Sequence, residues 1–162
     1  MKVFISHSSR DAEKAKEICS IIEQNGHSCF FAPRDIRSGH EYAEELINGI
    51  DACGTMLLLL SENSNASPHV LREVERAASR KIPIMVYKLE EVQISRSMEY
   101  FLMTHQWLNE KADKGYGEII RSINSLDGIE KNVNSTEKST AAKRPLYHAI
   151  VATVGAIALI AG

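Results

Sequence analysis

Short apolar runs alternate with helical hydrophobic patterns along the first 126 residues of the chain. The apolar runs have the length of strands, and they occupy residues 3–5, 28–32, 55–60, 82–87 and 105–108. The third run, TMLLLL, is almost continuously apolar, which is typical of a strand buried on both faces of a parallel sheet. Between the runs, apolar positions recur every three or four residues, as on one face of a helix.

Capping residues and turn residues bound the predicted helices. Ser8 or Ser9 can cap the first helix, and Gly26 is its expected stop. Ser67 supplies an N-cap for a later helix, and Pro68 fits its first helical position. Further helices are predicted at about residues 40–53, 95–102 and 118–126. This alternation predicts an α/β fold with a parallel sheet of about five strands, helices on both faces and right-handed crossovers.

Ligands of such folds bind outside the carboxyl ends of the strands. The loops expected to form a site are therefore residues 6–10, 33–39 and 61–67. Ser6 and His7 follow the first strand, where backbone and hydroxyl groups can bind phosphate or ribose, although helix capping is an equally ordinary use of this loop. Arg34 could pair with a pyrophosphate or with a neighbouring domain, or it could simply be solvated.

Composition excludes several classes of protein. The 162 residues carry a net charge of −2, so no global field favours nucleic acid. The three cysteines, Cys19, Cys29 and Cys53, form no CxxC pair, and we expect buried free thiols in a reducing cytosol. No metal site is expected, because His and Cys are scattered without ligand spacing. Trp107, the one tryptophan, is expected in the core.

The chain changes character after residue 126. Residues 127–145 are polar without an apolar period, and we interpret them as a flexible linker. Residues 146–162 contain no acid, Lys or Arg and approach the length of a membrane span, which predicts a transmembrane helix; a buried terminal helix is the alternative. Lys138, Lys143 and Arg144 precede this segment, so the positive-inside rule predicts a single-pass protein whose N-terminal domain lies in the cytoplasm. Such a segment is either a tail anchor or part of a longer membrane protein.

Four stretches occur in the order and spacing of a known family: VFISHSSRD, CFFAPRDIRSGHEYAEELINGI, LLLLSENSNASPHVLREVERA and MEYFLMTHQWLNE. Together they span nearly all of residues 1–126, and they resemble TIR (Toll/interleukin-1 receptor) domains of the bacterial type. The resemblance implies a flavodoxin-like fold and one of two activities. One is cleavage of the nicotinamide–ribose bond of NAD⁺ by a glycohydrolase or cyclase, often in anti-phage or stress signalling. The other is that of a non-enzymatic signalling adaptor, and both involve self-association through TIR–TIR contacts.

The resemblance also assigns roles to particular residues. Glu73 stands at the position of the catalytic glutamate, in the helix after the third strand, and His69 takes the aromatic position four residues earlier. Gly39 is the glycine of the family's BB loop. NAD⁺ would be the substrate, and no further cofactor is expected. Its cleavage passes through an oxocarbenium ion that one carboxylate can stabilise, and because nicotinamide leaves from a cationic state, no general acid is required.

The fold alone would also fit a receiver domain of two-component signalling. That class needs an acidic pair after the first strand and an aspartate at the end of the third. Ser6-His7 and Leu60-Ser61 occupy these places, so we reject this alternative. No Walker A or GxGxxG motif is present either.

Overall fold

The computed structural model of the chain describes residues 1–36, 41–103, 105–108 and 116–128. They belong to one compact unit, Met1–Gly128. Within these described residues no helix has the length and apolar character needed to cross a membrane. The predicted transmembrane segment 146–162, most of the predicted linker 127–145 and Gly39 lie outside the described residues.

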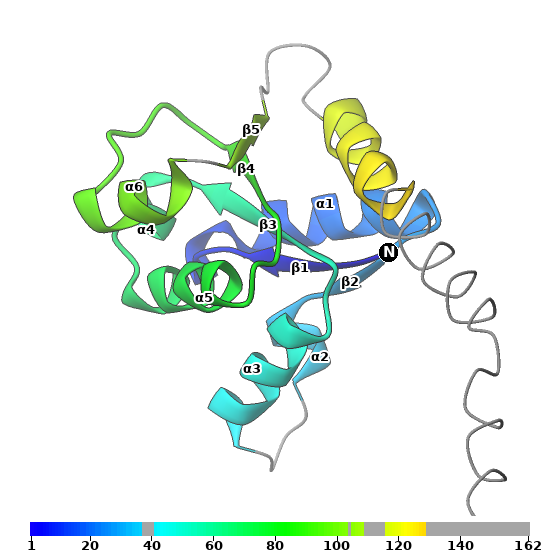
Figure 1. Cartoon of the computed structure of the whole chain (residues 1–162), viewed down its shortest axis with the longest axis horizontal. Coiled ribbons are helices and arrows are strands. Elements are labelled where there is room, and N and C mark those ends of the chain that lie inside the picture. Colours follow the sequence, from blue (N-terminus) through cyan, green and yellow to red (C-terminus); the bar gives the residue numbers. More distant parts are fainter. Residues whose placement is uncertain (37–40, 104, 109–115, 129–162) are drawn as a thin grey trace, which may run out of the picture. The chain divides into compact units, whose positions relative to one another are not determined.

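The centre of the unit is a sheet of five parallel strands in the order β2-β1-β3-β4-β5 (Figure 1). The strands are β1 (Lys2–Ser6), β2 (Ser28–Phe30), β3 (Thr55–Leu60), β4 (Ile84–Lys88) and β5 (Gln106–Leu108). Every residue of β3 is buried, as expected of a central strand covered on both faces. The predicted five-stranded parallel sheet is therefore confirmed.

Helices cover both faces of the sheet. One face packs against α1 (Ala12–Gln24) and a final helix at residues 116–128, and the other packs against α3 (Tyr42–Asp51), α5 (Pro68–Ser79) and α6 (Arg96–Leu102). Short turns η1 (Ser9–Asp11), α2 (Ala32–Asp35) and α4 (Glu62–Asn65) complete the order. Alternate residues of β3 face the two layers, which gives the sheet two separate apolar cores.

The segment after β2 departs from the sequence-based expectation. The predicted strand 28–32 ends at Phe30, and the predicted loop 33–39 begins as the short helix α2. The side chain of Asp35 accepts a hydrogen bond from the backbone N–H of Phe31 at 2.8 Å, which turns the chain directly after the strand. A local carboxylate–backbone bond of this kind competes with strand pairing, and it ends β2 early.

The prediction that Trp107 lies in the core is wrong. Its side chain is 39% exposed, because β5 is an edge strand and Leu108 takes the inward position. The ammonium group of Lys88 lies 5.7 Å from the centre of the indole ring, a cation–π contact at the surface. The prediction for the three cysteines is confirmed: Cys19, Cys29 and Cys53 are free and buried.

A close approach between α3 and β2 requires a glycine. A Cβ atom built on Gly49 would lie 2.4 Å from the ring of Phe30, far inside van der Waals contact. The ring of Phe30 in turn stacks on Phe4, with ring centres 5.4 Å apart. This contact fixes the distance of α3 from the sheet edge, and the first turn of α3 borders the site described next.

Candidate active site

A partly buried carboxylate lies at the carboxyl end of β1. Ser67 caps α5, and Val70, Val74 and Ala77 bury one stripe of that helix against the sheet. Glu73 lies at the border of this stripe, where its side chain reaches the end of β1. There the buried hydroxyl of Ser6 donates a hydrogen bond to Oε2 of Glu73 at 2.6 Å.

Burial dominates the electrostatics of this carboxylate. Loss of solvent raises the pKa of Glu73 from 4.5 to about 7, and the hydrogen bond from Ser6, which favours the charged form, offsets only part of that effect. A carboxyl group that titrates near neutral pH inside a protein is typical of functional sites. The arrangement can hold a positive charge, because a desolvated carboxylate interacts more strongly with a cation than a solvated one does.

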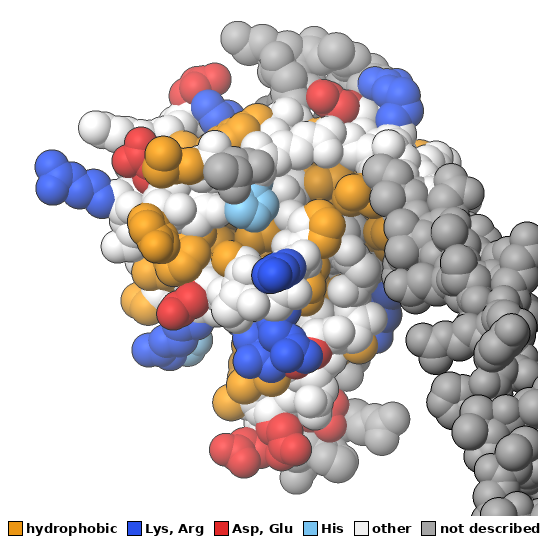
Figure 2. Space-filling view, viewed as in Figure 1, with side chains coloured by type: hydrophobic (Ala, Val, Ile, Leu, Met, Phe, Trp, Pro, Cys, Tyr) orange, Lys and Arg blue, Asp and Glu red, His pale blue; other side chains and the backbone are white. Residues whose placement is uncertain are grey.

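Two aromatic side chains come from the helices beside Glu73. His69 is exposed on α5, one turn before Glu73 and on the same side of the helix. Tyr42 begins α3 and is 57% exposed; burial and then the negative charge of Glu73 raise the pKa of its phenol. The first turn of α3 also carries Glu44 and Glu45, and Figure 2 shows acidic side chains gathered over this helix.

Two of the three predicted loops, residues 6–10 and 61–67, meet at the carboxyl end of the sheet. The hydroxyl of Ser61, directly after β3, donates a hydrogen bond to Oδ2 of Asp11 at 2.6 Å. Ser61 also forms a reciprocal capping box with Ser64 at the start of α4. A side-chain hydrogen bond therefore joins η1, which follows β1, to the residue that follows β3.

His7 has a packing contact of its own. Its ring stacks on Phe31 with centres 5.1 Å apart, and its Nδ1 lies 3.3 Å from the carbonyl oxygen of Ile5. Burial lowers the pKa of His7, against smaller opposing effects of the Ile5 carbonyl and the charge of Asp11. The ring of His7 packs Phe31 beside the end of β1.

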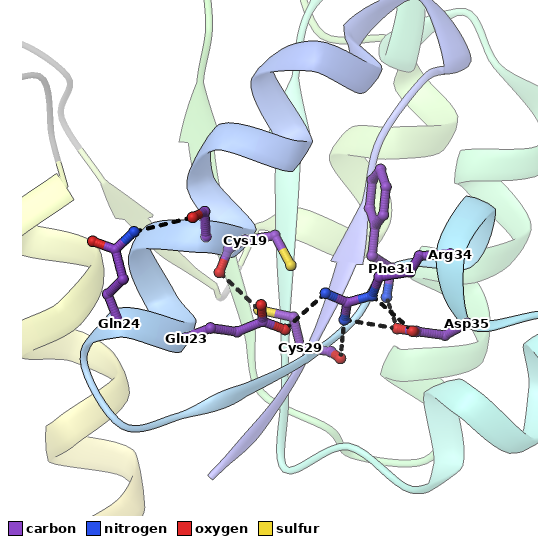
Figure 3. A network of polar contacts seen from close by, with 8 residues as sticks. Cys19, Glu23, Gln24, Cys29, Phe31, Arg34 and Asp35 are labelled. Carbon is purple, nitrogen blue, oxygen red and sulfur yellow. Dashed lines mark hydrogen bonds and ion pairs between the residues drawn. The ribbon is translucent and has the colours of Figure 1, made fainter.

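Arg34 lies away from Glu73, between α1, β2 and α2 (Figure 3). Its guanidinium donates hydrogen bonds to Asp35 at 2.8 Å and to Glu23 at 2.9 Å. A further bond reaches the carbonyl oxygen of Cys29 at 3.1 Å. None of these bonds reaches Ser6 or Glu73, so the structure gives Arg34 the role of joining three elements.

A cavity of about 590 Å³ lies at the other end of the sheet, beside the amino ends of β4 and β5. Its lining includes Ile82, Ile84, Phe101, His105 and Gln106. The Glu73 carboxylate takes no part in it. This cavity and the perturbed acid are therefore separate, and we place the candidate site at the carboxylate.

Sequence reasoning missed two sets of residues. Tyr42 was interpreted only as part of an apolar helix face. Cys19, Glu23 and Cys29 come together with their ligand atoms within 4.8 Å of one another. The available signal was the spacing of Cys19 and Glu23, four residues apart on one helix, but Cys29 joins them only through the pairing of β2 with β1.

Comparisons with known proteins agree on the fold. The TIR domain family model matches residues 3–120. The TIR domain of the Toll-related receptor TRR-2 from Hydra magnipapillata is 17% identical with a TM-score of 0.63, and the match covers 75% of this chain and 97% of that one. TIR domains of the activated Roq1 resistosome, which recognises the effector XopQ, are 14% identical with a TM-score of 0.57, covering 76% and 97%.

A further structural neighbour is a protein that is not described as a TIR domain. The CMP N-glycosidase BcmB from Clostridium botulinum is 11% identical with a TM-score of 0.54, and the match covers 76% of this chain and 99% of that one. At such low identity these likenesses show the fold alone. No match was found among curated proteins.

Proposed function

The chain belongs to the TIR domain family, and we propose that it cleaves the nicotinamide–ribose bond of NAD⁺ with Glu73 as its catalytic residue. The observation that carries the proposal is the partly buried Glu73 carboxylate, which accepts a hydrogen bond from Ser6 at the carboxyl end of the sheet. Its pKa of about 7 leaves a large fraction ionised at physiological pH. A carboxylate in that state can face a positive charge that develops on the substrate.

The proposed step breaks the bond between the ribose C1′ and the nicotinamide nitrogen. The bonding electrons move to that nitrogen, nicotinamide leaves neutral, and the ribose becomes an oxocarbenium ion. Glu73 stabilises this cation electrostatically in a site where the carboxylate is already desolvated. Water then adds at C1′ and loses a proton to give ADP-ribose, or an internal nucleophile adds to give a cyclic product.

Ser6 acts as a positioning residue in this scheme. Its hydroxyl bonds Oε2 of Glu73 at 2.6 Å, which fixes the carboxyl plane and leaves the other oxygen for the ribose. Tyr42 and His69 supply rings beside the carboxylate, and either can stack on the departing nicotinamide. Gly39, assigned by family position, is proposed to contact NAD⁺ or a neighbouring copy. Arg34, which bonds Glu23 and Asp35 away from Glu73, is proposed only for the contact with a neighbouring copy.

The proposed chemistry has a parallel among the structural neighbours. One of them is described as a CMP N-glycosidase, an enzyme that cleaves an N-glycosidic bond of a nucleotide. NAD⁺ presents the same type of bond, between a ribose and a ring nitrogen. At 11% identity this neighbour shares the fold alone, so the proposal of NAD⁺ cleavage rests on family membership and on Glu73.

We further propose that the protein acts as an assembly at a membrane. The segment 146–162 would anchor the chain with its TIR domain in the cytoplasm, and contacts between TIR domains would bring the sites together. A role in anti-phage or stress signalling follows from the same family resemblance. Assembly would raise activity by ordering the loops around Glu73.

Incubation with NAD⁺ tests the proposed function. The full chain, clustered on vesicles or by crowding, is expected to release nicotinamide, while clustered Glu73→Ala releases none above background. Product analysis then separates hydrolysis from cyclisation. Clustered wild-type protein that leaves NAD⁺ intact would instead favour the adaptor function, which needs no carboxylate at this position.

A further inference from the structure

Three metal-ligating side chains converge in the corner between α1 and β2 (Figure 3). Cys19 and Glu23 lie one turn apart on the same side of α1, and Cys29 lies on β2 after the turn at Gly26. Their two sulfur atoms and a carboxylate oxygen are all within 4.8 Å of one another. This group is separate from Glu73 and Ser6, and the proposed NAD⁺ chemistry makes no use of it.

The chemistry of the group suits one class of metal. Two thiolates with one carboxylate form a ligand set that Zn²⁺ accepts, and the soft sulfur atoms disfavour Mg²⁺ and Ca²⁺. Ligands around a tetrahedral zinc ion with Zn–S bonds of about 2.3 Å lie roughly 4 Å apart. The observed separation of at most 4.8 Å therefore requires only small side-chain movements.

The group has a route from solvent and an outer polar contact. Glu23 is exposed, which gives an ion a path from solvent to the two buried sulfurs. Arg34 donates to Oε1 of Glu23 at 2.9 Å, an outer contact of the kind that orients a metal-binding carboxylate.

Two thiolates and one carboxylate around a divalent cation leave one negative charge. The guanidinium of Arg34 lies beside Glu23 and the Cys29 carbonyl, but it also pairs with Asp35, so the corner keeps one net negative charge. Binding releases the two thiol protons to solvent, so affinity rises with pH.

We propose that Cys19, Glu23 and Cys29 bind one Zn²⁺ ion per chain, with a water molecule completing a tetrahedral site. The ion joins α1 to β2 and thereby stabilises the segment that leads through Phe31 to the stack on His7. This proposal goes beyond the proposed NAD⁺ activity and does not depend on it.

The test is a Zn²⁺ titration of the reduced full chain in competition with a chromophoric chelator. Wild-type protein and Cys53→Ser, which removes the third buried cysteine, are expected to bind one ion per chain. Cys19→Ser and Cys29→Ser are expected to lose binding, and Glu23→Gln to weaken it at least tenfold. Co²⁺ in place of Zn²⁺ should give full thiolate charge-transfer absorption with the wild type and with Cys53→Ser. This absorption should be lost or reduced in Cys19→Ser and Cys29→Ser.

Two results would overturn the proposal. One is that the reduced wild-type chain takes up no Zn²⁺. The other is uptake that Glu23→Gln leaves unchanged. Because Glu23 is exposed, this variant is expected to fold normally, and it decides the matter even if the buried cysteine variants do not fold.

Discussion

Glu73 shows a conflict between stability and chemistry at the scale of one residue. Burial raises its pKa to about 7, so the protein carries a carboxylate whose charged form is poorly solvated. The hydroxyl of Ser6, at 2.6 Å, compensates part of this cost. Residues that cost folding free energy in this way are typical of functional sites, where substrate rather than the fold supplies the missing partner.

Glu73→Gln is expected to stabilise the fold in a pH-dependent way. The folded pKa of about 7 lies above the unfolded value of 4.5, so the penalty is absent below 4.5, grows as pH rises, and is complete above about 7. The shift corresponds to roughly 3 kcal/mol as an upper value. Chemical denaturation should show a gain in unfolding free energy at about pH 8 and almost none near pH 4.5.

Glu75→Gln is the matched control for this measurement, because Glu75 is exposed on the same helix. It is expected to change the unfolding free energy by less than about 0.5 kcal/mol at either pH. A gain for Glu73→Gln that is equal at both pH values would contradict the raised pKa.

Ser6→Ala is expected to move the pH dependence of catalysis. The lost hydrogen bond favours the charged carboxylate, so its removal raises the pKa of Glu73 further. Such bonds contribute about 1.5–3 kcal/mol, which corresponds to roughly one pH unit or more. The rate of nicotinamide release should therefore rise with pH around a midpoint of about 7 in the wild type. In the variant this midpoint should lie higher by roughly one pH unit or more. Ser28→Ala, at an exposed serine on β2, should leave the midpoint in place.

Elements differed in how far the sequence alone could predict them. The central strand β3 was predicted at its observed bounds, because its burial comes from its own apolar run. The helix α2 was not predicted, because the letters PRD are typical of a loop. The hydrogen bond from the backbone N–H of Phe31 to the side chain of Asp35 that shapes this turn leaves no mark in the hydrophobic pattern. Trp107 was misplaced since an edge strand exposes residues that a central strand would bury.

Only part of the candidate site could be predicted from the sequence. Glu73 was predicted from its place in the family pattern, but its bond to Ser6 joins residues far apart in the chain and needs the pairing of α5 with β1. Arg34 was predicted from charge and loop position alone. Its partner Glu23 lies on the preceding helix, and nothing in the sequence indicates that pairing.

Gly49→Ala tests the packing of α3 on β2. The added Cβ would lie 2.4 Å from the ring of Phe30, and overpacking of this kind costs about 1–3 kcal/mol. Thermal unfolding should show a clear loss of stability. Asn48→Ala, one residue earlier and exposed, should be nearly neutral or slightly stabilising. Equal stability of the Gly49→Ala variant and wild type would mean that α3 can move away from the sheet.

At the scale of the whole molecule, the parallel sheet brings the carboxyl ends of β1 and β3, and with them Ser6 and Ser61, to the same end of the sheet. The helix α5 brings Glu73 to the same end. Activity in an assembly would then depend on what surrounds this end in neighbouring copies. The proposed membrane anchor acts at this scale, because it concentrates the domains on a surface.

Removal of residues 129–162 tests the proposed anchor. The full chain is expected to co-sediment with phospholipid vesicles, whereas residues 1–128, which form the compact unit, should stay in solution. Nicotinamide release by the full chain should increase on vesicles, and release by residues 1–128 should not. Equal partitioning of both proteins would contradict membrane attachment through the tail.

The central claim is that the Glu73 carboxylate cleaves the N-glycosidic bond of NAD⁺. The most direct measurement is the rate of nicotinamide release by the clustered full chain, with Glu73→Gln and Glu75→Gln assayed at the same density. The expected result is a loss of at least about 100-fold for Glu73→Gln, since a key electrostatic group is removed, and near wild-type rates for Glu75→Gln. No release by the clustered wild type, or equal rates for all three proteins, would contradict the claim.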